Sequence, residues 1–223
     1  MPTPRLSSSD RRASIIAAAR TVFARYGLEG ARTQQIAQAA GVSEALIFRH
    51  FSNKTAIYRA VLREVIADQD AAFRTAPLPE PSTFGLLDSI RRMLEHALRG
   101  QGAGNADGMR MVVGSLAGDG GYARLVYRRA MRLSRAGLER ALAAAREEGS
   151  ITGEPMSVTN ASAFLEHVST MIMMAHCHEQ SAIPYDEDHD RLLRDAISFC
   201  GRGIGISDER IREFLESMPA QMA

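Results

Sequence analysis

The sequence predicts an all-helical protein, with a three-helix head of the helix-turn-helix kind at the N-terminus and a larger helical body. Apolar residues recur three and four positions apart through most of the 223 residues, which is the period of a helix with one buried face. No window alternates strictly between apolar and polar residues, as a half-buried strand would. Prolines and glycines separate the periodic runs, so we expect about ten helices, three or four of them in the head.

Each helix has its own boundary signals in the sequence. Asp10 is a good cap for the first helix, and Gly27 ends its apolar pattern. The prolines of residues 77–81 mark a linker, and the four glycines of residues 100–108 indicate a flexible loop. The expected helices lie at about 10–26, 33–40, 43–51, 53–76, 82–98, 109–116, 122–148, 157–180, 190–201 and 208–218.

A tight turn joins two short helices in the head. The first covers residues 33–40 and has Thr33 as its cap. Gly41 takes the left-handed turn position, where a Cβ atom would clash, and Ser43 caps the second helix. Together these features predict a helix-turn-helix at about residues 32–51.

The second of these helices has two different faces. Ile47 and Phe51 lie four residues apart on one face and can pack on the rest of the head. The opposite face is available to something outside the domain and carries Glu44, Ala45, Phe48 and Arg49. A helix-turn-helix presents its second helix to the major groove of DNA in this way.

Residues of this helix suit DNA in different ways. The planar guanidinium of Arg49 can bind a guanine edge or a phosphate. Glu44 can accept a hydrogen bond from a cytosine amino group, or it can simply strengthen the helix start through the helix dipole. Leu46 can touch a thymine methyl group or turn inward as additional core.

Lys54 is the only lysine of the chain and lies in the first turn of the next helix, after Asn53 as its cap. A cation at this position opposes the helix dipole, so stability alone would not favour it. An ammonium beside the free N–H groups of a helix start does suit a phosphate oxygen. We therefore expect Lys54 to contact the DNA backbone. Weaker candidates for the same role are Thr33, Gln34, Ser43 and His50.

The charge of the chain is unevenly distributed. Residues 1–64 hold ten basic and four acidic residues, a net +6, whereas the remainder holds 17 basic and 22 acidic residues, a net −5. A basic head on a mildly acidic body is expected when only the head meets phosphate. No run of eighteen apolar residues indicates a membrane span, and the first ten residues lack the apolar core of a signal peptide. We expect no membrane contact and a place in the cytoplasm.

The sequence carries no pattern that points to catalysis or to a bound metal or cofactor. There is no GxSxG, HExxH, phosphate-binding glycine loop or paired-cysteine redox motif. His176, Cys177 and His178 are consecutive, and consecutive helical residues point about 100° apart, so they cannot bind one ion together. We expect no enzyme activity, no metal site and no cofactor.

The string TQQIAQAAGVSEALIFRHFSNK over residues 33–54, with its flanking helices, resembles the TetR family of bacterial transcriptional regulators over about residues 10–70. Phe48 departs from the tyrosine that is common in the family, so a phenol-to-phosphate hydrogen bond is not available. The resemblance implies a DNA-binding domain over residues 1–70 and an effector-binding and dimerisation domain over residues 71–223.

The resemblance further implies a homodimer that binds a double-stranded inverted-repeat operator, most simply as a repressor, with an activator as the alternative. A small, mostly apolar effector would shift the helix that starts near Asn53 and so change the separation of the two recognition helices. The dimer interface would use the helices at 157–180 and 190–201, with Met174, His178, Leu193, Ile197 and Cys200 as candidates.

Methionines, histidines and aromatic residues of the body are the candidates for an effector pocket, because methionine adapts to irregular apolar ligands. They are Met93, His96, Met109, Tyr127, Met131, Phe164, His167 and Met171. Ordinary core packing is the alternative for each of the methionines. For the whole chain, the alternative is a helical ligand-binding or enzymatic protein whose basic head serves only as a packing module.

Overall fold

The computed structural model describes residues 7–75, 77–99, 103–176 and 183–218, and these ranges contain ten α-helices, as predicted. An isolated antiparallel bridge joins Ile151 to Ile206. The chain forms two compact units, the first made of residues 1–74 and 102–126 and the second of residues 75–101 and 127–223. None of the helices within the described ranges is both long enough and apolar enough to cross a membrane.

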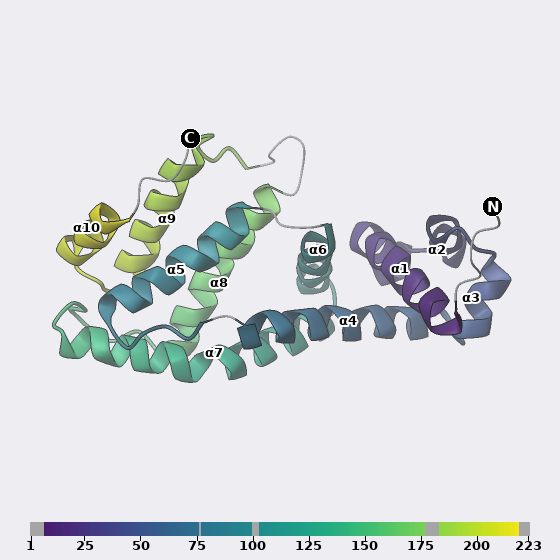
Figure 1. Ribbon diagram of the computed structural model, residues 1–223, viewed down its shortest axis with the longest axis horizontal. Helices are drawn as coiled ribbons and strands as arrows, with labels where there is room; N and C mark the ends of the chain where they lie inside the picture. Colours follow the sequence, from purple (N-terminus) through teal and green to yellow (C-terminus); the bar gives the residue numbers. More distant parts are fainter. Residues whose placement is uncertain (1–6, 76, 100–102, 177–182, 219–223) are drawn as a thin grey trace. The chain divides into compact units, whose positions relative to one another are not determined.

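The first unit contains the helix-turn-helix. Its helices are α1 (Ser8–Gly30), α2 (Thr33–Ala40), α3 (Glu44–His50), α4 (Lys54–Thr75), α6 (Ala103–Ala117) and the beginning of α7 (Gly121–Glu147) (Figure 1). α1 packs against both α2 and α6, and α2 packs against α3. Ile15, Ile16 and Phe23 supply the buried side of α1, and the ring of Phe23 meets the ring of Tyr58 edge-on at 5.0 Å.

The glycine-rich stretch at residues 100–108 is not the loop that the sequence predicts, because α6 already begins at Ala103. Gly108 lies in this helix, and a Cβ atom there would approach Val65 to 3.0 Å. The hydroxyl of Thr21 on α1 donates to the carboxylate of Asp107 at 3.0 Å. Close packing and a specific hydrogen bond to α1 thus outweigh the low helix propensity of glycine.

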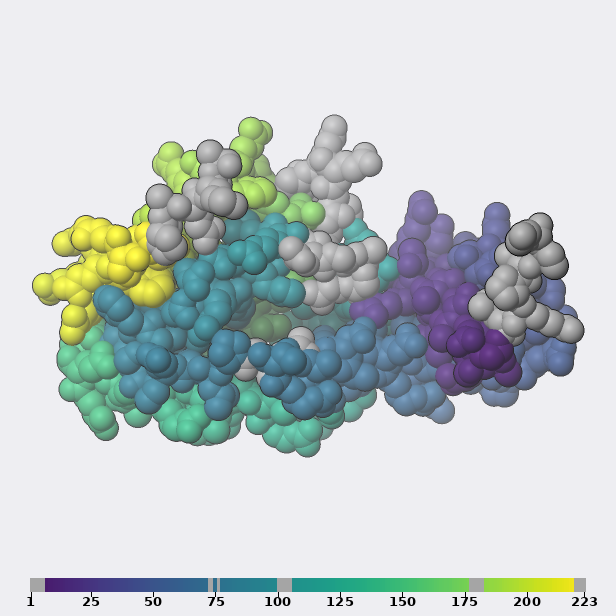
Figure 2. Space-filling model, in the orientation of Figure 1, coloured from purple at the N-terminus to yellow at the C-terminus, as the bar shows by residue number. Residues whose placement is uncertain are grey.

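The second unit is built around α5. Its helices are α5 (Thr83–Leu98), most of α7, α8 (Val158–Ala175), α9 (His189–Gly203) and α10 (Asp208–Ser217). α5 contacts α8, α9 and α10, and in Figure 2 the yellow side chains of α10 lie directly against those of α5. The rings of Phe84 on α5 and Phe214 on α10 meet edge-on at 5.6 Å.

Helix ends in the second unit follow local signals. α7 ends before Gly149, which has a left-handed φ of 70°, and Ser157 caps α8 by accepting a hydrogen bond from the N–H of Asn160. α8 ends at Ala175 rather than at Gln180, where the sequence places its end. Residues 177–182, which include His178 and Cys177, lie outside the described residues.

Cys200 on α9 is a buried free thiol, and its burial raises the thiol pKa to about 11. At pH 8 roughly one such thiol in a thousand is ionised, and the thiolate is the reactive form. In a Cys177→Ser variant we therefore expect Cys200 to resist Ellman's reagent at pH 8 in the native protein and to react at once in guanidinium chloride. Rapid, stoichiometric reaction of the native variant would show that this part of α9 opens readily.

Candidate nucleic-acid interface

The turn between α2 and α3 has the conformation that the sequence predicts. Gly41 has φ 63° and ψ 35°, and its N–H donates to the carbonyl oxygens at the end of α2. The hydroxyl of Ser43 accepts a hydrogen bond from the N–H of Leu46 at 3.2 Å, which caps α3. The direction of α3 relative to α2 is therefore determined by contacts within ten residues.

α3 buries one side and exposes the other. Ile47 and Phe51 are buried in the first unit. The side chains on the opposite side, which we call the recognition face, are exposed and belong to Glu44, Ala45, Phe48 and Arg49. Phe48 is 48% exposed and Arg49 is exposed, so an aromatic ring and a guanidinium at adjacent positions both present surface to the solvent. Such a face can meet the edges of base pairs.

Glu44 has a partner that sequence reasoning missed. The hydroxyl of Thr33 donates to its carboxylate, which ties the start of α3 to the start of α2. Thr33 is consequently not the cap of α2: the cap position belongs to Arg32, whose N–H donates to the side chain of Gln35 at 2.8 Å. Because Thr33 is the first residue of α2 and not its cap, its hydroxyl is available for the hydrogen bond to Glu44. The carboxylate of Glu44 thus has a structural role within the head.

Lys54 also has partners inside the unit. Its ammonium donates to the carbonyl oxygens of Glu29, at 3.2 Å, and Ala31, at 3.1 Å. These carbonyls lie at the end of α1, where a cation is favourable. The expectation that stability would not favour a cation at this position is therefore wrong. Asn53 caps α4 as predicted, since its side chain accepts from the N–H of Ala56 at 2.8 Å.

The other polar side chains near the motif differ in their exposure and in the contacts that hold them. The guanidinium of Arg12 lies 4.8 Å from the centre of the Phe51 ring, so the end of α3 holds it in place. Sequence reasoning did not single out Arg12, because the ring that positions it lies 39 residues further along the chain. Gln34 is exposed and His50 is half-buried. The ammonium of Lys54 retains one N–H beyond its two bonds to carbonyls.

The structure brings some of the effector-pocket candidates together. The rings of Tyr127 on α7 and His167 on α8 meet edge-on at 5.8 Å. The hydroxyl of Ser169 on α8 donates to the carbonyl oxygen of Met93 on α5 at 3.5 Å. The remaining candidates are differently placed: Met131 is half-buried in the second unit, His96, Phe164 and Met171 are exposed there, and Met109 belongs to the first unit.

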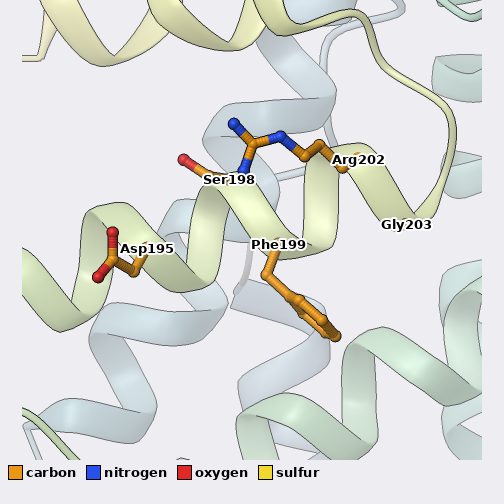
Figure 3. A pocket seen from close by; sticks show the side chains of 5 residues that line it. All are labelled: Asp195, Ser198, Phe199, Arg202 and Gly203. Atoms are coloured by element: carbon orange, nitrogen blue, oxygen red, sulfur yellow. The ribbon is translucent and has the colours of Figure 1, made fainter.

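The candidates for a subunit interface lie mostly inside one chain. Leu193, Ile197 and Cys200 are buried, so they offer no surface to a second copy, whereas Met174 is half-buried. The exposed face of α9 instead lines a shallow pocket with Asp195, Ser198, Phe199, Arg202 and Gly203 (Figure 3). Phe199 is 67% exposed and also lines a mostly apolar groove between α8 and α9, together with Val168 and Met171 among others.

Comparison with known proteins supports these observations for the head. The family model described as bacterial regulatory proteins, tetR family, matches residues 15–61. The chain is 37% identical over 91 residues to the HTH-type transcriptional repressor AcnR of Corynebacterium diphtheriae, covering 41% of this chain and 44% of that protein. It is 40% identical over 58 residues to the HTH-type transcriptional regulator RutR of Escherichia coli K12, and this match covers 26% of this chain and 27% of that protein. The match thus spans less than half the length of these curated relatives.

Solved structures share the fold over most of the chain. A bacterial regulatory protein of the tetR family from Rhodococcus RHA1 has a TM-score of 0.63 and 18% identity, covering 91% of this chain and all of that one. AibR, solved in complex with isovaleryl coenzyme A and operator DNA, has a TM-score of 0.61 and 16% identity, covering 88% of this chain and all of that one. At sequence identities of 18% and 16%, the similarity to these two structures shows a shared fold and nothing more.

Proposed function

We propose that the chain is a DNA-binding transcriptional regulator of the TetR family of bacterial regulatory proteins, whose α3 enters the major groove of an operator. One observation carries the proposal: α3 is held by Ile47 and Phe51 and turns an unpacked face outward. Arg49 on that face would read a base or a phosphate, while Lys54 and Arg12 would contact the backbone. The functional division into residues 1–70 for DNA and 71–223 for effector and dimerisation is part of the proposal.

We propose further that the protein acts in the cytoplasm as a homodimer on an inverted-repeat operator. In such a dimer the two recognition helices must reach major grooves one turn apart, at about 34–36 Å. A repressor released by a small effector is the simplest form. The repressor role is supported by the resemblance of the head to the named repressor AcnR. An effector that changes the separation of the heads by a few ångströms would then release the DNA.

The exposed faces of α8 and α9 are the surface that we propose for the second copy. Phe164, Met171 and Phe199 are large apolar side chains exposed there, and exposed apolar groups that are grouped in this way mark interaction sites. The groove between the helices has a volume of about 470 Å³ and an apolar lining, so an aromatic side chain from a second copy would fit it. This replaces the buried residues of α9 as the proposed contact.

The alternative function, a helical ligand-binding or enzymatic protein, differs in its behaviour toward DNA. A gel shift and footprint with DNA from upstream of its own gene should show protection of two half-sites related by two-fold symmetry. The same protein should ignore a fragment of equal length and random sequence at moderate salt. Equal, weak retardation of both fragments would favour the alternative function.

Arg49→Ala should weaken binding to the footprinted operator by about 1–3 kcal/mol more than binding to random DNA, if the guanidinium reads a base. Fluorescence anisotropy with both DNA fragments measures this difference. Arg146→Ala is the control, because it removes the same charge from an exposed position in the second unit. Equal losses on the two fragments would reassign Arg49 to the DNA backbone.

A further inference from the structure

α8 is an apolar helix with a single carboxylate. Between residues 158 and 175 the only acidic side chain is Glu166, and there is no lysine or arginine. The helical period puts Glu166 on the same side as Ser169 and Thr170, which are both buried in the second unit. The carboxylate therefore belongs to the inward side of α8, where a charge would be expected to have a partner.

Glu166 has no such partner among the described residues. Its carboxylate makes no hydrogen bond and no ion pair there, and the side chain is only partly exposed. Burial raises the pKa of this carboxyl group, and the neighbouring His167 offsets only part of the effect. A half-buried carboxylate without hydrogen bonds costs free energy that a counter-charge would remove.

The surroundings of Glu166 come from three helices of the second unit. Tyr127 of α7 lies near enough for the carboxylate to contribute to the raised pKa of its phenol, after burial itself. The Tyr127 ring is held edge-on against His167, the neighbour of Glu166. On the same side of α8, Ser169 reaches the backbone of Met93 on α5. An aromatic ring, an apolar helix and one unpaired negative charge thus lie together.

We propose that Glu166 is the charge-recognising group of the effector site and that the effector carries a protonated amine on an apolar body. This inference rests on the proposed function, because it names the chemistry of the effector. An ionised carboxylate only accepts hydrogen bonds, so an ammonium supplies both the missing donors and the missing charge. The ring of Tyr127 can add a cation–π contact. An effector with its own carboxylate would be repelled.

Three ten-carbon probes of equal length test the charge preference by isothermal titration calorimetry: decylammonium, decanol and decanoate, each below its micellar concentration. We expect wild type to bind decylammonium about tenfold or more tightly than decanol, and decanoate most weakly. Glu166→Gln should lower the affinity for decylammonium by about tenfold or more and leave the affinity for decanol unchanged. Glu216→Gln is the control, since it removes the same charge from an exposed position on α10.

The proposal is overturned if wild type does not bind decylammonium, if it prefers decanoate, or if Glu166→Gln binds decylammonium as wild type does. Thermal unfolding without ligand gives an independent reading. Glu166→Gln should melt at the same temperature as wild type or a few degrees higher, because an unpaired charge is removed. A markedly lower melting temperature would reveal an internal partner and overturn the proposal.

Failure of this inference and failure of the proposed function can be told apart by a gel shift without ligand. If Glu166→Gln binds the operator as wild type does and its affinity for decylammonium also equals that of wild type, the DNA-binding function stands and the proposed ammonium site is wrong. If neither protein binds operator DNA specifically while the calorimetric preference holds, the ammonium site stands in a protein of another function.

Discussion

Ile197→Asp should yield no stably folded second unit. Ile197 is 0% exposed on α9, the helix that packs against α5 and α10. The substitution loses about 2–3 kcal/mol of apolar burial and also forces a carboxyl group into a site without partners, at a cost of several kcal/mol. The two losses together are a large fraction of the free energy of unfolding of an ordinary domain, which is about 5–15 kcal/mol. A circular dichroism melt should lack the cooperative transition of wild type.

Phe199→Asp is the matched control, because it puts the same charge two residues further along α9 at a side chain that is 67% exposed. This variant should melt near the wild-type temperature. If the proposed face joins two copies, sedimentation should show monomers, and operator affinity should fall because one head contacts only a half-site. A folded Ile197→Asp protein would contradict the burial of this residue, and a dimeric Phe199→Asp protein would place the interface elsewhere.

From the sequence alone, Ile197→Asp is expected to dissociate or unfold a dimer, because the residue is assigned to the subunit interface. The burial of Ile197 within one chain leaves unfolding as the expected outcome. Leu193, Ile197 and Cys200 do form the continuous apolar face that the helical period indicates. The period identifies a face that must be covered, and it does not identify what covers it. α5 and α10 of the same chain cover it here.

Lys54→Ala should weaken DNA binding and destabilise the first unit together. Loss of one phosphate contact should reduce the affinity for all sequences alike and lower the salt slope by about one. Loss of two charge-assisted hydrogen bonds to Glu29 and Ala31 should cost about 1–3 kcal/mol of stability. From the sequence, the helix dipole predicts that the substitution leaves folding stability unchanged or slightly improved. The two hydrogen bonds in the structure predict a loss of stability instead. Thermal unfolding and a salt titration of operator binding measure the two effects.

Arg59→Ala is the control for Lys54→Ala, since it removes a positive charge from an exposed position on the same helix. Its effect on stability should stay within about 0.5 kcal/mol. Lys54→Arg should retain most of the DNA affinity, because the charge remains. If Lys54→Ala melts like wild type, the two bonds to α1 contribute nothing. If its salt slope is also unchanged, the side chain does not contact phosphate.

The helix-turn-helix could be predicted from the sequence because it is specified locally. Gly41, the Ser43 cap and the Ile47–Phe51 pair act within ten residues of one another, and backbone sterics, capping and helical period decide their conformation. The exposed recognition face follows from the same period. The resemblance in residues 15–61 has the same origin, since it matches this short, locally determined segment.

Only the tertiary structure decided the partners of particular side chains. Lys54 meets carbonyls more than twenty residues earlier, Asp107 meets Thr21 across α1 and α6, and Ile197 is buried on α9, which packs against α5 and α10. None of these pairings follows from spacing, because packing brings together segments that are distant in the chain. The same holds for Glu166: the helical period places it on the inward side of α8, but only the assembled helices show that no described residue pairs with its carboxylate. The sequence by itself therefore determined that the chain is helical and which side of α3 is exposed. Packing between distant helices decided which charges are paired and which apolar faces remain open.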